Sequence, residues 1–200
     1  MESFHWDKNF VTGLPGVDQQ HQHLVAIINQ FGDLLAENKV AFNDLEEVFE
    51  KLADYAKYHF REEEALMAEV GIDRRHLGPH IEAHRSFLRE ISAMHAGLSP
   101  DNLDAAKHIL DLLTHWLAYH ILGSDQNMAR QMAAIGSGVE ASRAYDEEER
   151  ASDNATEPLL IALNGLFNQV SARNRDLLAL NRSLEEKVRQ RTLELSEANL

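Results

Sequence analysis

Histidine and carboxylate side chains recur at helical spacing along the first two thirds of the chain. His59 and Glu63 are four residues apart, and so are His80 and His84, so each pair lies on one face of a helix. The complete set of candidate donors spans four segments: His21, His59, Glu63, His80, His84, His120 and Asp125. Five imidazoles and two carboxylates exceed the donors of one tetrahedral zinc ion and suit a pair of iron ions.

The spacing between His120 and Asp125 does not suit a regular α-helix. These residues are five positions apart. On an α-helix that step separates them by about 140° around the axis, whereas a four-residue step gives about 40°. Gly123 lies between them and eases the wider turn of a π-helix, which occurs often at functional sites. We therefore expect a π-type turn that brings Asp125 back to the face of His120.

Apolar residues at helical spacing predict the scaffold that positions these donors. They mark four helices, at about residues 18–35, 43–70, 79–96 and 101–132. Asp18 and Asn43 are suitable N-caps, and Gly71 is a suitable helix end. Because the connections are short, we expect an all-α fold, an antiparallel up-and-down four-helix bundle with a long C-terminal helix.

Pro79 determines where the third helix is expected to begin. Proline is tolerated in the first turn of a helix but not in its interior. A start near Pro79 places His80 and His84 on the helix and leaves His76 in the preceding loop. We expect all histidines outside the candidate set to lie in loops or on the surface: His5, His23, His76, His95, His108 and His115.

The composition excludes several other kinds of site and location. The chain has no cysteine, which excludes disulfide bonds, iron–sulfur clusters and thiolate zinc sites. Its net charge of −14 disfavours binding to nucleic acid and to anionic membrane surfaces. The N-terminus has no signal-peptide pattern, and no stretch of about 18 apolar residues occurs. We therefore expect a cytoplasmic protein that binds neither nucleic acid nor membrane.

Residues 157–200 follow a different pattern, a seven-residue repeat. The inward positions step by three and four: Leu160, Leu163, Phe167, Val170, Asn174, Leu177, Asn181, Leu184, Val188, Arg191, Leu195 and Ala198. A repeat of this length predicts a coiled coil, and the two inward asparagines favour a parallel homodimer. The alternative is a long amphipathic helix that folds back onto the bundle. Because the repeat continues to Leu200, we expect an output domain after it.

These patterns divide the chain into three parts. We expect residues 1–135 to form the metal-binding bundle, residues 136–156 an acidic linker, and residues 157–200 a dimerising helix that leads to the output domain. Residues 1–17 are irregular and punctuated by glycine and proline. We expect this N-terminal arm to pack over the bundle.

The candidate donors and their neighbours resemble the bacterial branch of the hemerythrin family. The matching segments are Val17-Asp18-Gln19-Gln20-His21, His59-Phe60-x-x-Glu63-Glu64-x-x-Met67, His80-x-x-x-His84, Trp116-Leu117-x-x-His120-Ile121 and His120-x-x-x-x-Asp125. The resemblance covers about residues 4–130. It implies a four-helix bundle around two iron ions that are joined by an oxo or hydroxo bridge and take O2 as a ligand.

The resemblance also implies a role for each donor. Glu63 and Asp125 would bridge the two irons. His80, His84 and His120 would complete one iron. His21 and His59 would serve the other iron, which keeps an open position for O2. Apolar residues one position or one turn from these ligands are expected to keep the O2 site dry, the alternative being ordinary core packing: Phe60, Met67, Trp116, Leu117 and Ile121.

Together these features predict an O2-binding or redox-sensing di-iron head joined to a signalling helix. The segment from Ser183 to Leu195 resembles the coils that precede diguanylate cyclase (GGDEF) or histidine kinase domains. We expect no enzymatic activity within the 200 residues themselves.

Two other functions remain open at this stage. The first is O2 storage or delivery, which needs no heptad tail. The second is a di-iron oxidase or peroxidase, but ferritin-like oxidases use two Glu-x-x-His pairs, and the candidate donors form none.

Overall fold

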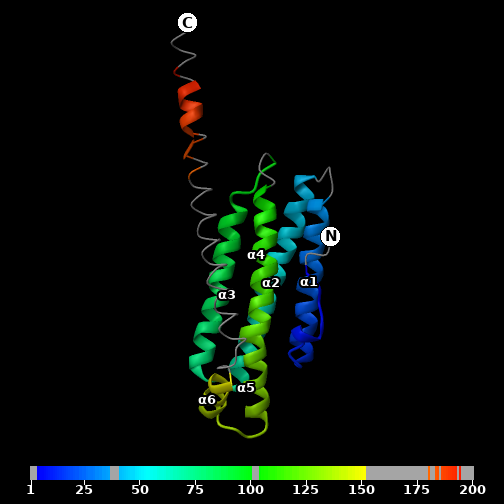
Figure 1. Cartoon of the computed structure of the whole chain (residues 1–200), viewed down its shortest axis with the longest axis vertical. Helices are drawn as coiled ribbons and strands as arrows, with labels where there is room; N and C mark the ends of the chain where they lie inside the picture. Colours follow the sequence, from blue (N-terminus) through cyan, green and yellow to red (C-terminus); the bar gives the residue numbers. More distant parts are fainter. Residues whose placement is uncertain are drawn as a thin grey trace. The chain divides into compact units, whose positions relative to one another are not determined.

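The computed structural model describes residues 4–36, 41–100 and 104–151, with residues 180, 183–184, 186–192 and 194 of the C-terminal segment. The chain divides into two units, residues 1–162 and 163–200. The predicted fold class is confirmed, because the chain forms a helical bundle with a further C-terminal helix (Figure 1). Within the described part of the chain, no helix combines the length and apolarity that crossing a bilayer requires.

Four long helices lie side by side and reverse direction at each connection (Figure 1). They are α1 (Pro15–Ala36), α2 (Phe42–Val70), α3 (Arg74–His95) and α4 (Asp104–His120). Each helix contacts two of the others, so the four form a closed ring. The shorter elements are η1 (Lys8–Phe10), η2 (Ile121–Asp125), α5 (Gln126–Gly136) and α6 (Ala141–Ala151). Because α4, η2 and α5 follow one another without a break, they form one long rod.

The antiparallel arrangement gives the bundle an apolar end and a polar end. Phe31, Leu45, Ile91 and Ile109 come from α1, α2, α3 and α4 and are at most 1% exposed. They lie toward the connections α1–α2 and α3–α4, whereas the candidate donors lie nearer the opposite ends of the same helices. Burying each apolar side chain contributes about 1.5–3 kcal/mol to folding. The apolar end therefore stabilises the fold of the bundle independently of the buried polar residues.

The N-terminal arm packs against the bundle. Phe4 is buried, its N–H donates to Asn29 Oδ1 (2.8 Å), and Asn29 Nδ2 donates to the Phe4 carbonyl (2.8 Å). The Asp18 carboxylate accepts hydrogen bonds from the N–H groups of Thr12 (2.7 Å) and Gly13 (3.1 Å). Asp18 therefore fastens the arm, and α1 begins three residues earlier than predicted, at Pro15.

The expected start of the third helix at Pro79 is wrong. Helix α3 begins at Arg74, so His76 lies on the helix and not in a loop. Asp73 is the N-cap, and its side chain accepts a hydrogen bond from the Arg75 N–H (2.8 Å). Proline normally clashes with the Cβ of the residue before it, but that residue is Gly78, which has none. The helix therefore continues through Pro79.

The region expected to be an acidic linker contains helix α6. Ala144 of α6 is 3% exposed, and α6 packs against α5. Residues 141–151 thus belong to the same unit as the bundle. Residues 152–156 lie outside the described residues, so the division of the chain into bundle, linker and dimerising helix stays a prediction.

Most of the heptad positions lie outside the described residues, and so does the predicted start of the fourth helix near Asp101. The described inward positions Leu184, Val188 and Arg191 are helical. The apolar side chains of Leu184 and Val188 are 48% and 65% exposed. The coiled-coil homodimer therefore stays a prediction.

The end of α2 provides a test of local backbone energetics. Gly71 has φ +77°, and its N–H donates to the Met67 carbonyl (3.1 Å). Because a Cβ disfavours positive φ, Gly71→Ala should lower the free energy of unfolding by about 1 kcal/mol. Urea unfolding followed by circular dichroism measures the change.

Gly16→Ala is the matched control. Gly16 lies in the first turn of α1 at negative φ, and an added Cβ meets nothing within 4 Å. The Gly16→Ala substitution should leave the free energy of unfolding unchanged or raise it by up to about 1 kcal/mol. Equal destabilisation by both substitutions would contradict the left-handed cap at Gly71.

Candidate metal centre

All seven candidate donors point into the polar end of the bundle. His21 lies on α1, His59 and Glu63 on α2, and His80 and His84 on α3. His120 ends α4 and Asp125 ends η2. None of the seven is more than 3% exposed. The structure therefore brings together every donor that the spacing singled out.

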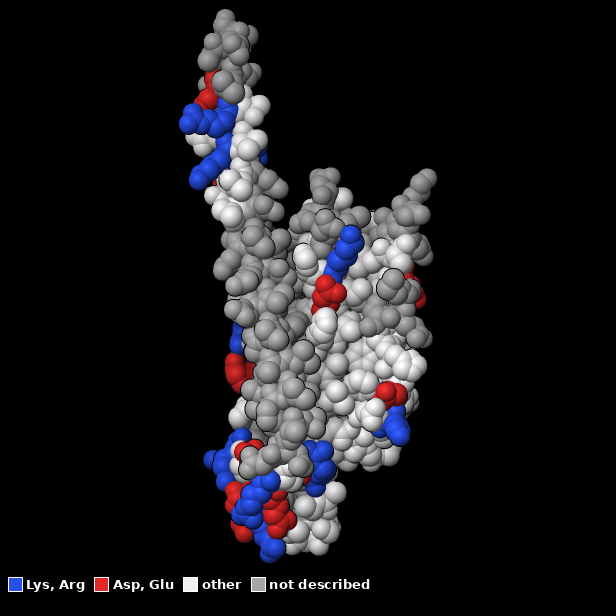
Figure 2. All heavy atoms as spheres, in the orientation of Figure 1, with Lys and Arg blue, Asp and Glu red and all other residues white. Residues whose placement is uncertain are grey.

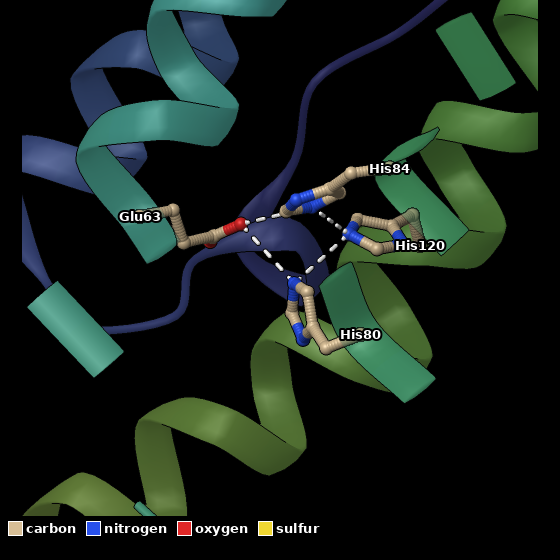
Figure 3. A group of neighbouring side chains, drawn as sticks. All are labelled: Glu63, His80, His84 and His120. Atoms are coloured by element: carbon tan, nitrogen blue, oxygen red, sulfur yellow. Dashed lines mark hydrogen bonds and ion pairs between the residues drawn. The ribbon is translucent and has the colours of Figure 1, made fainter. Parts of the chain in front are cut away.

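Four of these side chains converge on one point (Figure 3). Glu63 Oε2 lies 3.2 Å from His80 Nε2 and 3.4 Å from His84 Nε2. His120 Nε2 lies 2.9 Å from His84 Nε2 and 3.2 Å from His80 Nε2. Ligands held about 2.1 Å from an ion are separated by about 3.0 Å in an octahedron and about 3.4 Å in a tetrahedron. The spacing of the four atoms therefore fits a shared metal ion.

A second group shares Glu63 with the first. It comprises His21, His59 and Glu63, whose donor atoms lie within 4.8 Å of one another. The rings of His21 and His59 are 4.7 Å apart, and His59 Nε2 lies 3.9 Å from Glu63 Oε2. Because Glu63 belongs to both groups, its carboxylate lies between two possible ion positions.

Asp125 also faces both groups. Its Oδ1 lies 3.1 Å from His120 Nε2 and 3.5 Å from His80 Nε2. Its Oδ2 lies 3.2 Å from His21 Nε2. The two oxygens of one carboxylate are thus directed at different sets of imidazoles, an arrangement that suits a bridging ligand.

The expected π-type turn is confirmed, and it explains how Asp125 reaches this position. Residues Ile121–Asp125 form the π-helix η2 between α4 and α5. In a π-helix residues five apart are paired, so Asp125 returns to the face that carries His120. A regular α-helix would direct the two side chains apart.

Several donor atoms in the centre have no hydrogen-bond partner. They are His21 Nδ1 and Nε2, His59 Nε2, Glu63 Oε1, and both carboxylate oxygens of Asp125. The imidazole nitrogens of His21 and His120 lie 3.2 and 3.1 Å from the Asp125 oxygens, but the Asp125 oxygens have no hydrogen-bond partner. A buried polar atom without a partner costs about 1–3 kcal/mol. A bound cation would remove this cost, so the donor set fits metal ions.

The protonation states of three of the donors also suit metal binding. Burial lowers the pKa of His59 to about 3, and burial with the nearby His80 and His84 lowers the pKa of His120 well below its ordinary value. Both imidazoles are therefore neutral at pH 7, with a lone pair free. Burial raises the pKa of Glu63, but hydrogen bonds with His80 and His84 outweigh it and hold this pKa well below its usual range. Glu63 is therefore an ionised ligand.

Asp125 is in the opposite situation. Burial, together with the charge of Glu63, raises the pKa of the Asp125 carboxyl. Two carboxylates in one dry site repel each other, and a nearby cation relieves that repulsion. The two carboxylates, like the donor atoms without hydrogen-bond partners, therefore indicate that the centre fits metal ions.

Three polar residues outside the candidate set contact the second nitrogen of a donor histidine. Gln20 Oε1 lies 2.8 Å from His59 Nδ1, and Glu64 Oε1 lies 3.0 Å from His84 Nδ1. His76 Nε2 lies 3.2 Å from His80 Nδ1. Such contacts fix the orientation of a ligand ring.

Sequence reasoning assigned no role to these three residues. Gln20 and Glu64 each adjoin a candidate donor, and His76 precedes His80 by one helical turn. The four-residue spacing from His76 to His80, repeated from His80 to His84, could have indicated that His76 lies on the same helix face as these donors.

Apolar and aromatic side chains enclose the centre. Phe60 stacks on His84 (4.0 Å between ring centres), and Trp116 stacks on His120 (4.3 Å). Phe60, Trp116 and Leu117 line a small apolar cavity inside the bundle. Ile121 is fully buried, and Met67 packs with Ile72, Met128 and Met132 in a separate cluster.

Comparison with known proteins agrees with this geometry. The model of the Hemerythrin HHE cation binding domain matches residues 12–132. The bacteriohemerythrin of Clostridium acetobutylicum is 28% identical over 128 residues, which cover 62% of this chain and 96% of that protein. The Pseudomonas aeruginosa bacteriohemerythrin is 31% identical over 120 residues, covering 60% of this chain and 75% of that protein.

The similarity extends beyond bacteria. A hemerythrin-like protein of Naegleria gruberi is 30% identical over 122 residues, covering 61% of this chain and 87% of that protein. No solved structure matches significantly. Membership of the hemerythrin family implies a di-iron centre that binds O2, and the buried histidines and carboxylates supply donors for it. Because the domain model matches well over half of its residues, this chain belongs to the hemerythrin HHE cation-binding family.

Proposed function

We propose that the seven buried donors hold two iron ions as a reversible O2-binding centre. His80, His84 and His120 bind one iron. His21 and His59 bind the other. Glu63 and Asp125 bridge the pair. The convergence of these seven side chains, each at most 3% exposed, is the observation that carries the proposal.

The two halves of the centre are unequal in donors. One group contains three histidines around Glu63, and the other contains two. The side with His21 and His59 therefore has room for an additional ligand. When bound, two ferrous ions supply the electrons and the open coordination position that O2 binding requires. Nitrogen donors outnumber carboxylates five to two, which favours reversible binding over oxidase or peroxidase chemistry.

The surrounding residues exclude water and hold the ligands in place. Phe60 and Trp116 cover the imidazoles of His84 and His120, and Leu117 extends the apolar lining. A dry pocket slows the entry of water and anions, which promote loss of bound O2. We propose that Phe60, Trp116, Leu117, Ile121 and Met67 serve the O2 pocket, with Met67 acting from the adjoining cluster.

We further propose that the bundle is an O2 or redox sensor within a cytoplasmic signalling protein. Residues 157–200 would form a homodimeric coiled coil that passes the state of the centre to an output domain such as a diguanylate cyclase or histidine kinase. The exposed apolar side chains of Leu184 and Val188, four residues apart on a helix, support this coil. The alternative is O2 storage or delivery, in which the coil has no role.

Metal removal tests the centre through stability. A ligand present at 100 times its Kd stabilises the folded state by about 2.7 kcal/mol. Chelating the iron should therefore lower the free energy of unfolding by at least about this amount. Glu63→Gln should abolish the dependence on chelator, because it removes the carboxylate common to both groups. Urea unfolding with and without chelator measures both effects.

Glu62→Gln is the matched control for Glu63→Gln. Glu62 is the preceding residue on α2, but its side chain is 48% exposed. This variant should keep the full response to chelator. If Glu63→Gln also kept it, the bridging role of Glu63 would be wrong.

Absorption spectroscopy with metal analysis tests O2 binding directly. We expect two irons per chain and near-ultraviolet and visible bands that change on dithionite reduction and on exposure to O2. His59→Ala should abolish the O2-dependent changes. His23→Ala should keep them, because His23 is exposed on the outer face of α1. An unaltered spectrum in the His59 variant would show that the ligand set is wrong.

The sensor and storage functions differ in what happens outside the bundle. The double variant Leu184→Asp and Val188→Asp should weaken dimer formation at least about tenfold, because it places charges in the heptad seam. The control Glu186→Gln changes an exposed residue of the same helix. Sedimentation of the reduced protein with and without O2 measures the dimer.

A sensor should give different dimer stability or shape in the two conditions. Identical dimers with and without O2 would favour storage. Loss of O2 binding in the double variant would contradict a separate role for the coil.

A further inference from the structure

One arginine of α3, Arg75, contacts helix α6 at three residues. Arg75 Nη1 pairs with Asp146 (2.8 Å), and Arg75 Nη2 donates to the Ser142 carbonyl (3.1 Å). The guanidinium also lies 4.2 Å from the centre of the Tyr145 ring. Figure 2 shows basic and acidic side chains gathered at the end of the bundle where α6 lies. Arg75 therefore contacts three residues of one face of α6.

The guanidinium is held in place from its own helix. Arg75 Nε and Nη2 donate to the two carboxylate oxygens of Asp73, each at 3.0 Å. This fork is the strongest geometry between arginine and a carboxylate. Because Asp73 is also the N-cap of α3, Arg75 moves with the first turn of that helix.

Helix α6 also packs against α5. Arg130 of α5 pairs with Glu148, and Ala144 is buried. The side chains of Arg75 and Asp146 are 48% and 45% exposed, so water weakens their attraction. The contact between α3 and α6 through Arg75 is therefore modest, a condition that permits this contact to open.

The same turn of α3 contacts the candidate metal centre. His76 directly follows Arg75, and its Nε2 lies 3.2 Å from His80 Nδ1. His80 Nε2 faces the centre, 3.2 Å from Glu63 Oε2. When Nε2 binds a metal, Nδ1 carries the hydrogen and donates it to His76. The His80 ring therefore lies between the centre and the first turn of α3.

We propose that this first turn couples the metal centre to helix α6. His76 is a positioning residue that orients His80, and Arg75 in the same turn holds Tyr145 and Asp146. The inference rests on the proposed iron-binding function and adds a route by which the centre acts on the rest of the chain. Helix α6 is the last described helix of the unit formed by residues 1–162, so its docking precedes the C-terminal segment.

The coupling has a definite sign. Bound iron would fix Nε2 of His80. The hydrogen bond from His80 Nδ1 to His76 would then order the first turn of α3 and hold Arg75 more firmly against α6. Because linkage is reciprocal, docking of α6 also favours the His80 orientation that binds iron. Iron should therefore protect α6 from opening.

Hydrogen exchange of the full chain, with and without iron, tests the coupling. The backbone amides of Ala141–Ala151 should exchange about fivefold more slowly in the iron-loaded wild type. Arg75→Gln should speed their exchange and remove the iron dependence. Arg74→Gln removes the same charge from the adjacent residue, which is exposed, and should behave as wild type.

Variants of His76 separate positioning from simple packing. His76→Leu removes the acceptor for His80 and should abolish the iron dependence at α6 and shift the absorption bands of the loaded protein. His76→Gln keeps an amide oxygen that can accept the same hydrogen bond, and should restore both. Far-ultraviolet circular dichroism verifies that each variant is folded.

The outcomes distinguish this inference from the function on which it rests. If the wild type binds two irons but α6 exchanges equally with and without them, the coupling is wrong and the iron centre stands. If Arg75→Gln and Arg74→Gln behave alike, Arg75 does not hold α6. If the wild type binds no iron, both proposals fall.

Discussion

The cost of burying seven ionisable donors inside an apolar bundle constrains the whole structure. Six donor atoms in the centre have no hydrogen-bond partner, and carboxylate oxygens of both Glu63 and Asp125 lie within 3.5 Å of His80 Nε2. In a medium of low polarity such groups are stable only when cations or hydrogen bonds compensate them. The protein therefore needs both a metal to satisfy the donors and a separate source of folding energy.

The antiparallel bundle meets both needs by separating them along its axis. One end carries fully buried apolar residues from all four helices, including Phe31 and Ile109. The other end carries the donors, of which His120 directly precedes the π-helical turn and Asp125 ends it. That turn gives up regular helical hydrogen bonding so that His120 and Asp125 face the same centre.

The ligands are held from outside by chemically different groups. An amide contacts His59, a carboxylate contacts His84 and an imidazole contacts His80. Such contacts fix the orientation of the ligand rings and tune their basicity. The imidazole contact, through His76, also lies next to Arg75, which contacts α6, and so contacts toward the centre and toward helix α6 come from one helical turn.

The sequence alone determined the features that depend on local spacing. The four-residue step from His59 to Glu63, the five-residue step that requires a π-turn, and the helix end at Gly71 are properties of neighbouring residues. Only the tertiary structure decided features that depend on opposing local preferences or on contacts between residues far apart in the sequence. With Asp73 as N-cap and no Cβ at Gly78, α3 begins before Pro79 and continues through it, although a helix start was expected there. Arg75 reaches Asp146 across 71 positions of the chain, and Gln20 reaches His59 across 39. No local pattern specifies such pairs, because their contact exists only after the helices pack.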